Sequence, residues 1–225
     1  MKALLFDLDG TLIDSMPLHH NAWVEWHARR GTVMNRDDLS FAKTAGRSNA
    51  ELLLDLFPEH SVEEHLVMAD AKEAIYREFA TRSLQLIAGA REFVEQARAA
   101  GCKLAVCTAA TLPNMALAFE RHGIDAWVDT VTSPADGLRG KPHPDIFLEA
   151  ARRLGIAPEH CVVFEDAPLG VEGARRAGMK AVALTTTLPA AAFAEFDNLI
   201  AIAPDFTRLA LHELQRAHQE AQQDA

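Results

Sequence analysis

Short apolar runs that end abruptly at polar residues constrain the fold of this 225-residue chain more than any other feature. Four runs have the length and composition of buried strands, and a fifth is weaker. They are Ala3–Phe6, Lys103–Cys107, Cys161–Phe164 and Lys180–Leu184, with Val128–Thr132 as the weaker one. Segments with helical spacing lie between the later runs. Strands that alternate with helices predict a doubly wound, Rossmann-like and mostly parallel α/β sheet.

Glycines mark the ends of four of these helical segments, at Gly101, Gly123, Gly155 and Gly178. A glycine just past a helix adopts the left-handed conformation without a steric penalty, so it commonly terminates the helix. The spacing of these glycines supports the same alternation of strand and helix.

One stretch, from about Ser15 to Ser83, interrupts the alternation because it contains no convincing strand. A helix is expected over Pro17–Arg30, with Trp23 and Trp26 on its inner face. Two Ser-x-x-Glu capping boxes, beginning at Ser48 and Ser61, open further helices. We therefore expect a helical cap over residues 16–83, inserted after the first strand into a core made of residues 1–15 and 84–225.

The charge balance limits the classes of partner. Lys and Arg number 22 and Asp and Glu number 32, so the formal net charge is −10. Nucleic-acid binding needs clustered basic residues, so we expect no nucleic-acid partner. Apolar runs fall short of the ~20 residues that span a bilayer, and the apolar start is too short for a signal peptide. We expect a cytoplasmic monomer with no membrane partner, in which Cys102, Cys107 and Cys161 are buried thiols.

Chemically useful side chains gather where the expected strands end. The first strand is followed by Asp7-Leu8-Asp9-Gly10-Thr11, the second by Thr108-Ala109, and the fourth by Glu165-Asp166. The loop after the weaker strand carries Gly140-Lys141-Pro142, in which we interpret Pro142, like Pro144, as a helix-start residue. Ligands of open α/β sheets bind outside the carboxyl ends of the strands, so these groups should share one edge. Several carboxylates in one place need a cation, and oxygen ligands favour Mg²⁺.

The four segments resemble the four motifs of the haloacid dehalogenase superfamily of aspartyl phosphotransferases, in the same order and with similar spacing. The similarity is greatest to the β-phosphoglucomutase-like and sugar phosphatase group with a helical cap. It implies a magnesium-dependent phosphatase that acts on a small phosphorylated metabolite, such as a sugar phosphate, through an aspartyl-phosphate.

Catalytic and metal-binding roles follow from this resemblance for the motif residues. Asp7 would be the nucleophile and Asp9 the general acid and base. The metal would be held by Asp7, Asp9 (through its backbone carbonyl) and Asp166, with Glu165 joining directly, acting through water or only bracing the site. Thr108, the amide of Ala109 and Lys141 would bind the transferring phosphoryl group.

Three residues of the expected cap are candidate substrate-binding residues: His19, Arg47 and Lys72. His19 resembles a histidine that supports hinge closure in β-phosphoglucomutase-like enzymes, and a structural role explains it equally well. Lys72 resembles a cap lysine that shields the active site, but the interpretation we favour is an exposed helix lysine. Arg47 suits a second anionic or hydroxylated group of the substrate.

Two other functions stay open. A β-phosphoglucomutase-type isomerase resembles the chain in Asp9, His19 and Lys72, but it carries an arginine where this sequence has Asn49. A catalytically silent protein that binds a phosphometabolite would be expected to lack Asp7, Asp9 or Lys141, all of which are present.

Overall fold

The computed structural model describes residues 1–35 and 39–223. In this part of the chain, six strands form a single sheet in the order β3-β2-β1-β4-β5-β6, and all of the neighbouring strands are parallel. The strands are β1 Ala3–Phe6, β2 Lys103–Cys107, β3 Thr130–Thr132, β4 Cys161–Glu165, β5 Lys180–Leu184 and β6 Leu199–Ala203. The predicted doubly wound α/β fold is confirmed.

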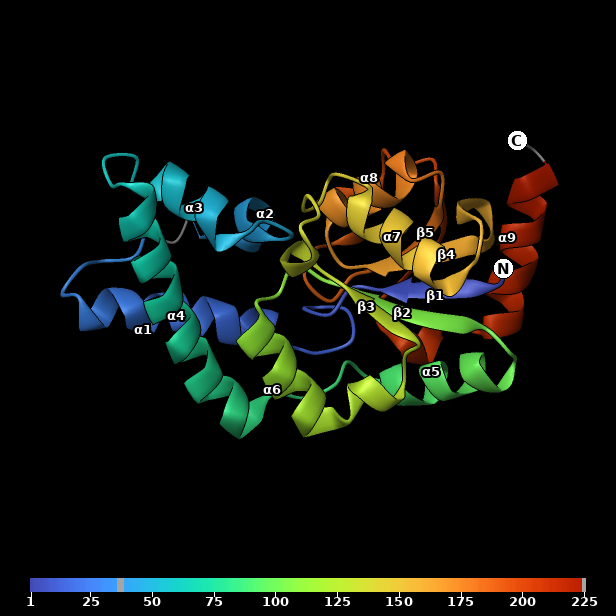
Figure 1. Cartoon of the computed structure of the whole chain (residues 1–225), viewed down its shortest axis with the longest axis horizontal. Helices are drawn as coiled ribbons and strands as arrows, with labels where there is room; N and C mark the ends of the chain where they lie inside the picture. Colours follow the sequence, from blue (N-terminus) through green and yellow to red (C-terminus); the bar gives the residue numbers. More distant parts are fainter. Residues whose placement is uncertain (36–38, 224–225) are drawn as a thin grey trace.

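Helices cover both faces of the sheet and form a separate group beyond one of its ends (Figure 1). The sheet-covering helices are α5 Ala90–Ala99, α6 Leu112–His122, α7 Asp145–Leu154, α8 Pro168–Arg176 and α9 Leu211–Gln223. The separate group contains α1 Met16–Arg29, α2 Phe41–Thr44, α3 Asn49–Leu56 and α4 Val62–Ser83. We call this second group, α1–α4, the cap.

Alternation along β1 explains why helices pack on both faces. Leu4 and Phe6 belong to one apolar core, which includes Phe93 of α5, while Ala3 and Leu5 belong to a second core beneath α7 and α8. Side chains two residues apart on a strand share a face, so a strand that is apolar throughout must be covered on both sides. The predicted buried thiols are confirmed, since Cys102, Cys107 and Cys161 are free and buried.

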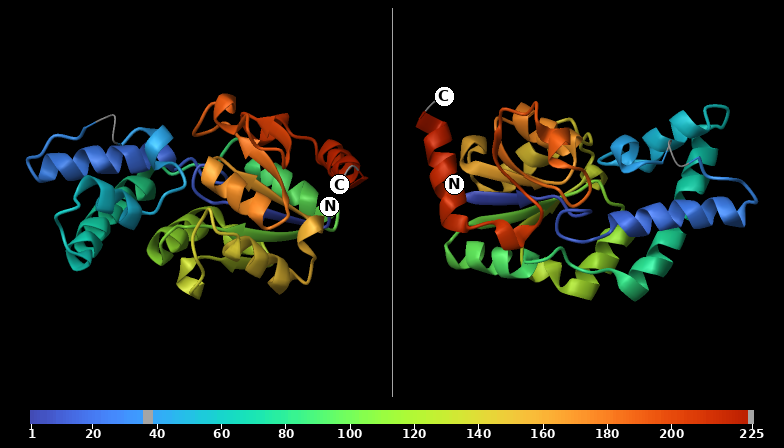
Figure 2. Two further views of the ribbon diagram at one scale, coloured as in Figure 1. Left: turned by 90° about the horizontal axis from the view of Figure 1, so that it is seen from above. Right: turned by 180° about the vertical axis from the view of Figure 1, so that it is seen from behind.

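The cap forms where the sequence places its helix signals. Ser48 and Ser61 accept hydrogen bonds from the backbone N–H groups of Glu51 and Glu64, so both capping boxes are confirmed. The inner-face placement of Trp23 and Trp26 is also confirmed, because both side chains are buried. Figure 2 shows from two further directions that the cap lies at one end of the molecule, whereas the two termini lie at the other. The division of the chain into domains at residues 16 and 84 stays a prediction.

Three details differ from the sequence-based expectations. Strand β6 was not expected, although its sequence, Leu-Ile-Ala-Ile-Ala, is an apolar run like those of the predicted strands; it lies at the sheet edge, where most of its side chains are half-exposed. Strand β3 begins at Thr130, two residues later than predicted. The interpretation of Pro142 as a helix-start residue is wrong, because α7 begins at Asp145 with Pro144 as its N-cap.

None of the helices in the described ranges combines the length and the apolar character that crossing a membrane requires.

Candidate active site

The carboxyl edge of the sheet has a switch point beside β1. The chain runs from β1 through β2 to β3 on one side, and β4 lies on the other side of β1. Asp7 directly follows β1, and its backbone N–H donates to the carbonyl of Phe164 in β4 at 3.0 Å. Ligands of doubly wound sheets bind at such a point, outside the strand ends.

Lys141 connects two of the predicted acidic residues there. Its ammonium lies 2.5 Å from Oδ1 of Asp7 and 2.5 Å from Oε1 of Glu165. All three side chains are buried. The loop after β3 therefore brings its lysine between the ends of β1 and β4, as the strand-end argument predicts.

Asp166 completes a group of three carboxylates. Oxygen atoms of Asp7, Glu165 and Asp166 all lie within 4.8 Å of one another. The hydroxyl of Thr11 donates to Asp166 Oδ1 at 3.4 Å. Gly10 makes the close approach possible, because a Cβ on it would lie 2.1 Å from Asp166 Oδ2. Its φ of +77° is also one that other residues rarely adopt.

Burial makes this set of charges unfavourable without a further cation. Burial raises the pKa of Asp166 to about 7, and the charge of Asp7 adds to the effect. Burial also raises the pKa of Asp7 and, more strongly, that of Glu165, although Lys141 opposes both shifts. Fully ionised, three carboxylates and one ammonium carry a net charge of −2, which a divalent cation cancels. The oxygen donors suit Mg²⁺, so the residues present fit the metal predicted from the sequence.

Thr108 and Ala109 follow β2, the other neighbour of β1. Val106 pairs with Phe6 in the sheet, so Thr108 lies at the same edge as Asp7. The Thr108 side chain is fully buried, and its hydroxyl accepts a hydrogen bond from the Ala110 N–H at 2.9 Å. Ala109 is exposed.

A chain of contacts leads from Asp9 into the cap. His19 Nε2 of α1 lies 3.5 Å from Oδ1 of Asp9, and His19 Nδ1 lies 2.7 Å from the ammonium of Lys72. The His19 ring also stacks on Tyr76 with 3.8 Å between ring centroids. Burial acts to raise the pKa of Asp9, but the hydrogen bond and charge of His19 outweigh it and lower that pKa. His19 thus connects the cap to the second aspartate of the motif.

The interpretation of Lys72 as an exposed helix lysine is wrong. Its side chain is 2% exposed, and its ammonium lies 2.8 Å from Oε1 of Glu73 and over the ring of Trp23. A buried ammonium needs such a partner, because burial disfavours its charged form and lowers the Lys72 pKa. Helical spacing cannot show that α1 packs against this side of α4. The sequence therefore contains no indication that Lys72 is buried.

The side-chain contacts of Arg47 do not include the carboxylate cluster. Its guanidinium donates to Oδ2 of Asp55 at 2.7 Å and to the backbone carbonyl of Glu51 at 3.1 Å. Both partners belong to α3, so the predicted binding of a second substrate group by Arg47 has no support from these contacts.

Residues 1–178 match the family model of haloacid dehalogenase-like hydrolases. The chain belongs to this family.

Relatives and solved structures agree with that membership. The chain is 35% identical over 202 residues to validoxylamine A 7'-phosphate phosphatase of Streptomyces hygroscopicus subsp. limoneus, covering 88% of this chain and 92% of that protein. It is 34% identical over 194 residues to hexitol phosphatase A of Escherichia coli K12, covering 81% and 82%. The crystal structure of a family IA, variant 3 hydrolase from Entamoeba histolytica superposes with a TM-score of 0.89 at 28% identity, covering 97% and 100%.

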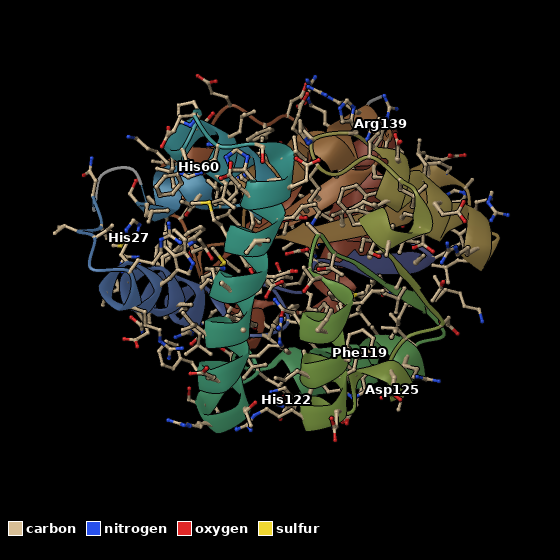
Figure 3. The ribbon with its side chains drawn as sticks, turned by 60° about the vertical axis from the view of Figure 1, so that its left-hand side comes forward. His27, His60, Phe119, His122, Asp125 and Arg139 are labelled. Atoms are coloured by element: carbon tan, nitrogen blue, oxygen red, sulfur yellow. The ribbon has the colours of Figure 1, made fainter. Side chains whose placement is uncertain are left out.

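Sequence reasoning missed two polar residues of this hydrolase. Glu73 and Asn114 are buried and hydrogen-bonded to each other, Asn114 Nδ2 to Glu73 Oε2 at 2.5 Å. Glu73 follows the candidate Lys72 directly, which is a signal that could have found it. Asn114 lies in α6 with no motif around it, so only the packing of α4 against α6 identifies it (Figure 3).

Proposed function

We propose that this hydrolase is a magnesium-dependent phosphatase of a small phosphorylated metabolite, acting through an aspartyl-phosphate on Asp7. The observation that carries the proposal is the contact of Lys141 with both Asp7 and Glu165, beside Asp166. A nucleophilic carboxylate, a fixed cation and further oxygen ligands are the components that phosphoryl transfer needs.

Side chains of Asp7 and Asp166 and the backbone carbonyl of Asp9 would hold the Mg²⁺, with Glu165 joining directly or through water. The ion supplies Lewis-acid stabilisation of the phosphoryl oxygens and keeps the substrate aligned with the nucleophile. Lys141 would neutralise charge between Asp7 and the phosphoryl group, while Thr108 and the Ala109 amide would donate hydrogen bonds to its oxygens.

In the first half of the reaction, a carboxylate oxygen of Asp7 attacks phosphorus and the bond from phosphorus to the leaving oxygen breaks. Asp9 gives its proton to that oxygen. The lowered pKa of Asp9 favours its ionised form in the free protein. A bound phosphate dianion beside Asp9 would raise that pKa, so substrate binding would supply the protonated acid.

In the second half, ionised Asp9 accepts a proton from water, and the water oxygen attacks the aspartyl-phosphate. The bond from phosphorus to Asp7 breaks, which regenerates the carboxylate and releases inorganic phosphate. The 3.5 Å contact of His19 with Asp9 supports this step, because an Nε2–H group would orient the carboxylate while Nδ1 accepts from the Lys72 ammonium.

The leaving group would bind between the proposed core and the proposed cap, which consists of residues 16–83. A sugar phosphate is the substrate that we propose. The support is that relatives over most of the chain are named for phosphatases of a hexitol and of validoxylamine A 7'-phosphate. His19 and Lys72 would lie near the leaving oxygen, because His19 contacts both Asp9 and Lys72. The protein would work as a cytoplasmic monomer.

A β-phosphoglucomutase-type isomerase is the second candidate. The contact chain from Asp9 through His19 to Lys72 favours it, because the resemblance to mutases includes these residues. Asn49 argues against the mutase, because the mutase pattern has an arginine at this position. In this chain the Asn49 side chain donates a hydrogen bond to Glu73 at 2.5 Å.

The test is a panel of phosphorylated metabolites assayed with and without Mg²⁺. Both free phosphate and isomerised sugar phosphate are measured, with p-nitrophenyl phosphate as the general substrate. The proposal expects Mg²⁺-dependent release of phosphate. Isomerised product without free phosphate would favour the mutase, and binding without turnover would favour a silent binding protein.

A further inference from the structure

Glu73 joins the cap to the core through one buried carboxylate. Its Oε1 accepts hydrogen bonds from Asn49 Nδ2 of α3 at 2.5 Å and from Lys72 Nζ at 2.8 Å, and its Oε2 accepts one from Asn114 Nδ2 of α6. His19 Nδ1 of α1 lies 3.9 Å from Oε1. Figure 3 shows α4 beside α6, the helix that carries the labelled Phe119 and His122.

These contacts balance the charge of Lys72 within the cap. Glu73 is 5% exposed, and its carboxylate lies in direct contact with the Lys72 ammonium, while the charge of Asp9 acts on Lys72 more weakly. Burial acts to raise the pKa of Glu73, but the charges of Lys72 and His19 outweigh it and hold that pKa at about 2. The carboxylate is therefore ionised at neutral pH and the Lys72–Glu73 pair is neutral. Arg47 is the other cationic residue that the sequence suggested for binding a second anionic group of the substrate, and it is paired with Asp55.

This balance determines what a leaving group would meet. If Asp9 protonates the leaving oxygen, the leaving group lies next to His19 and hence next to the Lys72–Glu73 pair and Asn49. An imidazole, an amide and a neutral ion pair offer hydrogen bonds to hydroxyl groups. A second phosphate there would lose its hydration and gain no net attraction from the neutral Lys72–Glu73 pair in return.

We propose that Glu73 sets the substrate class of this hydrolase: by cancelling the charge of Lys72, it admits the monophosphate of a neutral polyhydroxy compound and rejects one with a second phosphate. The inference rests on the proposed phosphatase function, whose failure would be visible separately.

Matched substrate pairs test the selectivity of the wild-type protein with Mg²⁺. Fructose 1-phosphate is compared with fructose 1,6-bisphosphate, and glucose 6-phosphate with glucose 1,6-bisphosphate. In at least one pair, kcat/KM is expected to favour the monophosphate at least about 100-fold, because a charged group that leaves water without a compensating cation costs several kcal/mol.

Glu73→Gln tests whether this residue is responsible. The variant keeps the side-chain volume but leaves the Lys72 charge uncompensated, so the preference is expected to fall at least about tenfold, mainly through a lower KM for the bisphosphate. Glu78→Gln is the matched control, because it removes a half-exposed carboxylate of the same helix, which pairs with Arg29, and should leave the preference unchanged. Glu73→Gln with Lys72→Gln restores the neutral balance and should recover the wild-type preference.

The outcomes separate the two proposals. A wild-type protein that hydrolyses p-nitrophenyl phosphate, but takes both members of every pair equally well or takes no monophosphate, overturns the selectivity inference alone. A Glu73→Gln variant that slows all substrates by the same factor shows a merely structural role and also overturns it. Should Glu73→Gln fail to fold, the wild-type pairs still decide. No turnover of p-nitrophenyl phosphate with Mg²⁺ would overturn the proposed function itself.

Discussion

The ammonium of Lys141 lies 2.5 Å from a carboxylate oxygen of Asp7, although the two residues are 134 positions apart in the sequence. The parallel sheet creates this contact, because Asp7 follows β1 and the Lys141 loop reaches the same edge from β3. Glu165, at the end of β4, holds the other side of the ammonium. The charge of one lysine is thus shared between two buried acids.

Removal of that lysine is expected to impair both folding and turnover. Lys141→Met leaves buried carboxylates without their ammonium, so the free energy of unfolding should fall by about 3–5 kcal/mol at neutral pH. The value of kcat should fall by about 10²–10³-fold. Denaturant titration and phosphate release measure the two effects.

Lys103→Met is the matched control for this substitution. Lys103 is half-exposed and lies 3.4 Å from Asp129, so its loss should cost at most about 1 kcal/mol. Equal effects of the two substitutions would contradict the role given to Lys141.

Asp9→Asn is expected to lower kcat by about 10²–10⁴-fold, because the asparagine amide can neither donate the acid proton nor accept one from water. With acetyl phosphate, whose leaving group needs little assistance, the variant should accumulate phosphorylated protein. Mass spectrometry after acid quenching measures the added phosphoryl group. A variant that turns over at the wild-type rate would exclude Asp9 as acid and base.

The contribution of Asp166 to the stability of the metal-free protein should depend on pH in a direction opposite to that of a carboxylate with a lowered pKa. The pKa of Asp166 is about 7 in the folded protein, against its usual 3.8. Between these values the folded chain keeps a proton that the unfolded chain loses, so stability is full below the lower value and decreases as pH rises toward 7. Mg²⁺ would bind the ionised cluster, so the rise in Tm that it causes should be larger at about pH 8 than at about pH 5.

Thermal unfolding in Mg²⁺ and in EDTA, at both pH values, measures this difference. Removal of Mg²⁺ should also abolish phosphate release. An increase in Tm that is the same at both pH values, or absent at both, would contradict the proposed metal cluster.

Gly10→Ala should disrupt the same carboxylate cluster by steric overlap. The new Cβ would lie 2.1 Å from Asp166 Oδ2, and the φ of +77° adds backbone strain. Gly178→Ala is the matched control, since its φ is +72° and nothing lies within 4 Å of its Cβ position. Both variants should lose about 1 kcal/mol from strain. Only Gly10→Ala should in addition weaken the dependence of Tm on Mg²⁺.

The strand ends were predictable because each polar motif directly follows an apolar run, and the parallel sheet brings such ends to one edge. Capping boxes at Ser48 and Ser61 likewise fix helix starts locally. Lys72, Glu73 and Asn114 were not predictable in the same way. Their environment depends on how α4 packs against α1 and α6, and helical spacing carries no information on which neighbour covers a given face.

The unexpected edge strand β6 differs from these residues, because its apolar run Leu199–Ala203 was present in the sequence and could have been predicted. Only one residue of β6, Ala203, is fully buried. The strand forms because β5 offers an unpaired edge to which it can add, with a register irregularity after Ala181. Local sequence and tertiary pairing therefore both favour this strand.

The most direct test of the account is the rate of phosphate release by Asp7→Asn with p-nitrophenyl phosphate and Mg²⁺, alongside circular dichroism to verify folding. Because this substitution keeps the side-chain volume but removes the nucleophile, kcat should fall by at least about 10⁴-fold in a folded protein. Wild-type turnover by folded Asp7→Asn would contradict the proposal that the phosphoryl group is transferred to Asp7.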